Sequence, residues 1–125
     1  MNLGHTFGHA LEAEAGYRGE LVHGEAVAVG MLMAMELSER LGLLDRQDIG
    51  RVENHYKKTG LLSQLPEISG VQWKAESLYA HMYQDKKVDQ GKLTFILMKA
   101  IGDAFITQDV EKSDILLSLQ KFTQS

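Results

Sequence analysis

The chain has 125 residues, 44% of them hydrophobic and 24% charged, which suits one globular domain with its own core. It contains no cysteine, which excludes disulfides and thiolate metal sites, so a tight metal site would have to use His, Asp or Glu. The net charge is −4 and no basic tract is interleaved with aromatic residues, which argues against a nucleic-acid partner.

Hydrophobic periodicity and end signals predict a mainly α fold, with one small β-hairpin, in a single domain over residues 1–125. In chain order, the helices are expected over residues 4–15, 23–41, 45–58, 73–84 and 113–122, and the hairpin strands over residues 92–98 and 104–107. Gly16, Gly42 and Gly60 follow the first three helices, where a left-handed C-terminal glycine is common. Asp45 is expected to cap the third helix, and Gly102 to form the hairpin turn.

The second predicted helix is apolar on every face between Ala26 and Met35. Such a helix is normally buried all round, so either the other elements wrap it or part of it faces a domain outside this chain. The run is too short to span a bilayer, and the N-terminus has no signal-peptide pattern. We therefore expect a soluble, cytoplasmic protein without membrane association.

Three histidines form the most informative pattern in the sequence. His5 and His9 are four residues apart, so on a helix they project from the same face, a spacing used by helical metal sites. Gly4 and Gly8 each precede one of them, at a cost to the helix of about 1 kcal/mol each, which suggests close approach of a ligand or another backbone. His23 begins the next helix, and the short loop before it could bring it beside His5.

Other polar residues carry weaker signals. Glu25 could orient a histidine as a second layer around a metal, whereas His55 and His81 lack such neighbours and are interpreted as structural. A histidine pair at this spacing also occurs in purely structural roles, so spacing alone leaves both interpretations open. The adjacent Lys86 and Lys87 could hold a phosphate, but a solvated pair that complements a helix end is the commoner case.

Several motifs together resemble one known family. They are NLGHTFGHA at residues 2–10, HGEAVAVGM at 23–31, SERLG at 38–42, DKK at 85–87, GKLTFIL at 91–97 and AIGDA at 100–104. In this order they are similar to the C-terminal domain of 3-dehydroquinate synthase, an enzyme of the shikimate pathway. The resemblance covers nearly the whole chain and implies the helical C-terminal domain of the dehydroquinate synthase-like fold.

The resemblance also implies roles for single residues. His5 and His23 would be ligands of zinc or cobalt, and His9 would be the catalytic residue that moves protons and stabilises charge on the substrate. Zinc held by neutral imidazoles can act as a Lewis acid, and a neighbouring imidazole can exchange protons near neutral pH.

The implied substrate is a phosphorylated sugar acid, 3-deoxy-arabino-heptulosonate 7-phosphate, which would be contacted by Asn2, Lys86 and Lys87. In the family, bound NAD+ transiently oxidises the substrate, phosphate is eliminated, and ring opening and closure give 3-dehydroquinate, so the enzyme is a lyase. An N-terminal NAD-binding domain, with a third metal ligand, is expected to be absent from this chain. We expect the full enzyme to be a homodimer, and this chain alone to be inactive and to bind zinc poorly.

Other interpretations remain. A sister sugar phosphate cyclase, such as 2-deoxy-scyllo-inosose synthase, would share the histidine motifs, and the glycerol dehydrogenase and iron-containing alcohol dehydrogenase group is a more distant relative. A non-catalytic helical module that docks a partner through Ala26 to Met35 would leave the glycine-flanked histidines unexplained. A metal storage or sensing module would bind metal without substrate.

Overall fold

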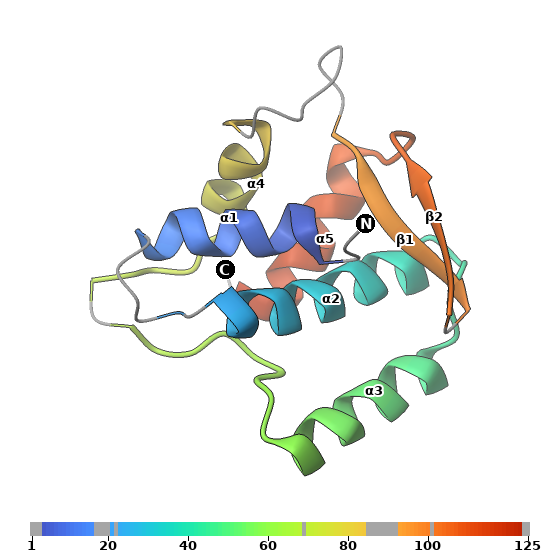
Figure 1. The fold of residues 1–125 in the computed structure, drawn as a ribbon. Coiled ribbons are helices and arrows are strands. Elements are labelled where there is room, and N and C mark those ends of the chain that lie inside the picture. The colour runs from blue at the N-terminus through green and yellow to red at the C-terminus, as the bar shows by residue number, and fades with distance from the viewer. Residues whose placement is uncertain are drawn as a thin grey trace.

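The computed structural model describes residues 4–16, 21, 23–68, 70–84, 93–100 and 102–123. The elements are α1 (His5–Ala15), α2 (His23–Arg40), α3 (Arg46–Thr59), α4 (Ala75–Gln84), β1 (Phe95–Ala100), β2 (Asp103–Thr107) and α5 (Lys112–Thr123). This order confirms the mainly α fold with one hairpin, drawn in Figure 1.

Helix ends follow the predicted capping residues. Gly16 and Gly60 lie in the left-handed conformation, with φ of 78° and 79°, and end α1 and α3. Asp45 caps α3 by accepting a hydrogen bond from the backbone N–H of Gln47 at 3.3 Å. The fourth helix begins two residues later than expected, because Trp73 belongs to the preceding connection and donates from its indole Nε1 to the carbonyl of Pro66 at 2.8 Å.

The first hairpin strand lies slightly later in the sequence than predicted, and the second begins one residue earlier, at Asp103 instead of Ala104. β1 and β2 pair in antiparallel register from Phe95 opposite Thr107 to Ala100 opposite Asp103, with an irregularity between Met98 and Ala100. The predicted start of the first strand, Lys92, lies outside the described residues. The inner face of β1 is buried at Phe95 and Leu97, so the hairpin covers the helices with one face only.

The apolar helix α2 lies at the centre of the molecule and contacts α1, β1, α3 and α5 (Figure 1). Its residues from Val29 to Ser38 are buried except for Met31. The buried Ser38 hydroxyl donates to the carbonyl of Ala34 at 2.8 Å and accepts the backbone N–H of Met98 at 3.0 Å, which ties α2 to β1. Elements of this chain therefore wrap most of α2, as one of the two predicted alternatives required.

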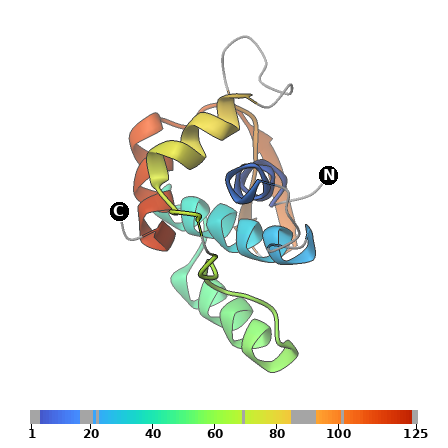
Figure 2. The same ribbon diagram turned by 90° about the vertical axis from the view of Figure 1, so that its left-hand side faces the viewer.

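Helix α3 projects away from the other helices (Figures 1 and 2). It packs on α2 through a second, smaller core that includes Ile49 and Tyr56. The Tyr56 hydroxyl is buried and donates to the carbonyl of Ala28 at 2.8 Å, and burial raises the pKa of Tyr56. Within the described residues, no helix is long and apolar enough to cross a membrane.

Candidate functional site

Three glycines let α1 and α2 approach each other backbone to backbone. A Cβ atom built on Gly30 would lie 2.7 Å from the carbonyl oxygen of Gly4 and 2.8 Å from the amide nitrogen of Gly8. A Cβ on Gly4 would lie 2.6 Å from the amide nitrogen of Met31. These distances are too short for any side chain, so Gly4 and Gly30 are explained by a close backbone contact, which is one of the two predicted reasons for Gly4. A Cβ on Gly8 would be tight, 3.3 Å from the carbonyl oxygen of Ala26.

His5 and His9 lie together on α1. Their ring centroids are 3.9 Å apart and the rings are tilted by 51°, as expected for residues one helical turn apart. Both residues are half-buried. Their N-terminal end of α1 is fixed to the hairpin, because the Thr6 hydroxyl donates to the carbonyl of Thr94 at 2.8 Å. The pair of imidazoles is thus presented on a helix that is anchored from two sides.

His23 lies at the start of α2 and contacts α1 through Glu12. Its Nδ1 is 3.0 Å from Oε2 of Glu12; the histidine side chain is 70% exposed, and the glutamate side chain only 15%. The prediction that Glu25 orients a histidine stays a prediction; the carboxylate that contacts the His23 ring in the structure is that of Glu12, which the sequence motifs do not single out. The available signal was the spacing of His5, His9 and Glu12, which places all three along one face of a helix.

Helices α1 and α2 run antiparallel, which decides where each histidine lies along α1. His23 meets α1 at Glu12, roughly 10 Å along the helix axis from the level of His5, since each residue adds about 1.5 Å. No three His, Asp or Glu side chains among the described residues come together as a metal site. The donor chemistry nevertheless suits zinc, because His5 and His23 offer imidazoles and one of them has a carboxylate on its other ring nitrogen.

The remaining predicted residues divide into two groups. Asn2, Lys86 and Lys87 lie outside the described residues. His55 is exposed on α3, and His81 on α4 lies 3.1 Å from Oε1 of Glu14, which links α4 to α1. Both positions agree with the structural interpretation of these two histidines.

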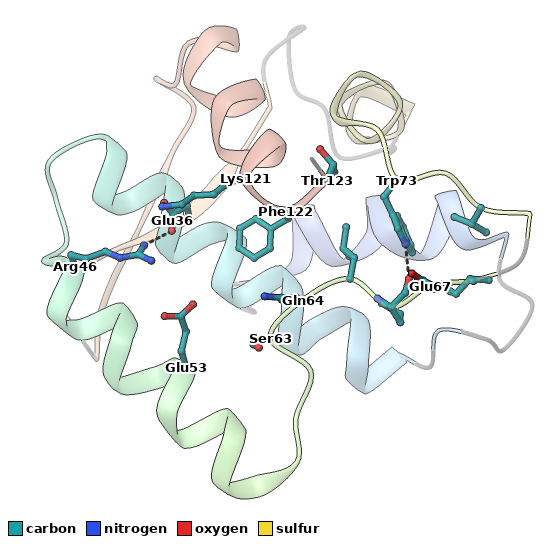
Figure 3. A pocket seen from close by; sticks show the side chains of 14 residues that line it. Glu36, Arg46, Glu53, Ser63, Gln64, Glu67, Trp73, Lys121, Phe122 and Thr123 are labelled. Atoms are coloured by element: carbon teal, nitrogen blue, oxygen red, sulfur yellow. Dashed lines mark hydrogen bonds and ion pairs between the residues drawn. The ribbon is translucent and has the colours of Figure 1, made fainter. Parts of the chain in front are cut away.

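A cleft of about 900 Å³ lies between α2, α3, α5 and the connection before α4 (Figure 3). The carboxylate of Glu36, whose side chain is 6% exposed, accepts hydrogen bonds from Arg46 and Lys121, both at 2.7 Å. Burial alone would raise the pKa of Glu36, but the hydrogen bonds from Lys121 and Arg46 outweigh it and hold this pKa below its ordinary value of 4.5. None of the three site histidines lines this cleft, and its two cations are already paired, so it is a weaker candidate for an anionic substrate.

Known proteins show the same pattern in sequence and in fold. The family model described as 3-dehydroquinate synthase C-terminal matches residues 1–88. The 3-dehydroquinate synthases of Roseobacter denitrificans and Nitrobacter winogradskyi are each 50% identical to this chain, over 100% and 90% of it. The matches cover 34% and 30% of those relatives, so the chain spans about a third of their length.

Solved structures of related cyclases share the fold. A 2-deoxy-scyllo-inosose synthase complexed with carbaglucose-6-phosphate, NAD+ and Co2+ matches with a TM-score of 0.78 and 28% identity, over 97% of this chain and 34% of the other. A 2-epi-5-epi-valiolone synthase from Streptomyces hygroscopicus with NAD+ and Zn2+ bound gives the same TM-score and identity, over 98% of this chain and 32% of the other.

Proposed function

Because the chain belongs to the 3-dehydroquinate synthase C-terminal family, we propose that it is the metal- and substrate-binding part of a 3-dehydroquinate synthase. The whole enzyme would convert 3-deoxy-arabino-heptulosonate 7-phosphate to 3-dehydroquinate with loss of phosphate. It would act in the shikimate pathway in the cytoplasm, as an NAD- and metal-dependent lyase.

The observation that carries this proposal is the α1–α2 crossing. Gly4, Gly8 and Gly30 hold the two helices in backbone contact, so that His5, His9 and His23 are all supplied by one rigid pair of helices. The alternative of a helical docking module needs an apolar helix that is open to a partner. Here α2 is contacted by α1, β1, α3 and α5 of its own chain, which argues against that alternative. The close packing of the glycines fixes the helices that carry these histidines, which supports a site at this crossing.

In this proposal His5 and His23 are metal ligands, and zinc or cobalt would supply Lewis-acid polarisation of a substrate oxygen. His9 is the proton-transfer residue, because its imidazole lies against His5 and can exchange protons near neutral pH. Asn2 would contact the substrate. Lys86 and Lys87 would hold the phosphate as it leaves, because ammonium groups stabilise the charge that develops there.

The proposal places NAD binding and a third metal ligand in an N-terminal domain of a longer protein. This agrees with the share of the relatives that the chain spans, about a third. It also agrees with the bound NAD+ and metal in the two structural relatives. The isolated 125-residue chain should therefore show no turnover and only weak zinc binding. Tight stoichiometric zinc on the isolated chain would favour a metal storage or sensing module instead.

A second candidate is the activity of 2-deoxy-scyllo-inosose synthase, since that protein shares the fold at a TM-score of 0.78. Its 28% identity is well below the 50% of the 3-dehydroquinate synthases, which favours the first candidate. The test is to offer the native-length protein, with NAD+ and zinc, the substrates of both enzymes separately and to identify products by mass spectrometry. We expect 3-dehydroquinate alone, whereas 2-deoxy-scyllo-inosose alone would reverse the assignment.

A further inference from the structure

We propose that Glu12 is a positioning residue that orients His23 for the metal. This inference rests on the proposed function, in which His23 is a metal ligand, and it gives a role to a carboxylate that the sequence motifs did not single out. The contact that carries it is the 3.0 Å approach between Oε2 of Glu12 and Nδ1 of His23.

The contact joins a half-buried carboxylate, Glu12, to an exposed imidazole, His23. Glu12 lies within α1 with its side chain only 15% exposed, whereas the His23 side chain at the start of α2 is 70% exposed. The glycine contacts hold α1 at one distance from α2, so the carboxylate stands at a set place relative to the base of the histidine. An exposed histidine ring would otherwise sample several rotamers. Glu12 therefore limits the directions in which this ring can point.

The same contact selects one tautomer of His23. A neutral imidazole has one N–H, and an ionised carboxylate can only accept a hydrogen bond. The proton must therefore be on Nδ1, which donates to Glu12 and leaves the lone pair of Nε2 available to a cation. Removing the hydrogen-bond partner behind a ligating histidine typically costs about 10–100-fold in metal affinity.

A second pair on the same helix offers a matched control. Oε1 of Glu14 lies 3.1 Å from Nε2 of His81, and the Glu14 side chain is 21% exposed, so the contact distance and the exposure of the glutamate match the Glu12 pair, although the ring nitrogen is the other one. This pair joins α1 to α4 rather than to the start of α2. If a Glu–His contact on α1 mattered only for folding, replacing either glutamate would have the same consequences.

The experiment compares Glu12→Gln, Glu14→Gln and His23→Ala in the native-length protein, by competition titration of Zn2+ against a chelator. Gln keeps the size of the side chain and removes its charge, and circular dichroism checks that each variant is folded. We expect E12Q to lose about 10–100-fold in zinc affinity, E14Q to keep the parental affinity, and H23A to lose more than E12Q. Nitrogen-15 NMR of the metal-free parent, at a pH where the imidazole is neutral, should show His23 protonated on Nδ1.

The outcomes separate this inference from the function on which it rests. If H23A keeps the parental zinc affinity, the metal assignment itself is wrong, and the inference falls with it. If H23A weakens zinc but E12Q does not, or if the parent carries the proton on Nε2, the role of Glu12 alone is overturned. Equal losses in E12Q and E14Q would reduce Glu12 to a structural residue and would likewise overturn it.

Discussion

The substitution Gly30→Ala tests the α1–α2 crossing on which the candidate site depends. The added methyl group would lie 2.7 Å from the Gly4 oxygen, 2.8 Å from the Gly8 nitrogen and 3.1 Å from the Gly8 Cα, where ordinary contacts begin at 3.4 Å. All three atoms belong to the backbone of α1, so no side chain can rotate away. The helices must separate by several tenths of an ångström, and the His5–His9 pair must move with α1.

The expected cost follows from two opposing effects. Overpacking of this kind typically costs about 1–3 kcal/mol, while alanine gains about 1 kcal/mol over glycine in a helix. The net cost is therefore about 0–2 kcal/mol, and because the clashing atoms are all backbone we expect G30A to lower the free energy of unfolding by about 1–2 kcal/mol, the upper half of that range. The matched control is Gly50→Ala on the exposed face of α3, where a Cβ would meet nothing within 4 Å. This variant should gain about 0.5–1 kcal/mol, because only the conformational effect remains.

The two free energies are measured by denaturant unfolding of the native-length protein, with hydrogen exchange to locate the change. Amides of α1 and α2 should exchange faster in G30A, and those of α3 should not. Zinc affinity should fall in G30A and stay at the parental value in G50A. A G30A variant as stable as its parent, with unchanged exchange in α1, would refute the close crossing and the positions it gives to the site histidines.

Two further predictions concern the attachment of α3. Tyr56→Phe removes the buried hydrogen bond to the Ala28 carbonyl and should cost about 1 kcal/mol, with faster hydrogen exchange confined to α3; uniform exchange across the helices would contradict this. Glu36→Gln removes the negative charge that pairs with Arg46 and Lys121, and it should lower the free energy of unfolding by about 1–2 kcal/mol at neutral pH. The cost stays this small because both partners are half-exposed and can return to water. The folded-state pKa of Glu36 is lowered, so its contribution is present above its unfolded value of about 4.5 and is lost as pH falls through the folded value. Unfolding curves at several pH values should therefore show parent and E36Q converging in acid, and a gap that widens there would be the opposite result.

Local sequence signals predicted the helices and the hairpin well, because the ends of these elements depend on residues that are neighbours in the sequence. Gly16, Gly60 and Asp45 end or begin helices as their conformational preferences require. The start of α4 was misplaced because Trp73 is held by the Pro66 carbonyl, a contact that no local pattern contains. The central position of α2 followed from its uniform apolarity, although which elements cover it did not.

Among the side-chain contacts at the candidate site, the sequence indicated one but not the other. The spacing of His5 and His9 indicated a shared face, and their rings are indeed in contact. The contact between Glu12 and His23 depends on the crossing of two helices, and the glycines alone do not fix which residues face each other. In the same way, Lys121 reaches Glu36 from a position 85 residues away, so only the tertiary structure could reveal that the cleft's cations are paired.

The most direct test of the central claim is the rate of 3-dehydroquinate formation by the native-length protein and by its His9→Ala and His55→Ala variants. His9 lies against His5 at the candidate site, whereas His55 is exposed on α3 and serves as the control. The account predicts turnover by the parent, a loss of kcat of about 100-fold or more in H9A, and parental turnover in H55A. Equal turnover in H9A and H55A would contradict the claim that this helix pair carries the catalytic histidine.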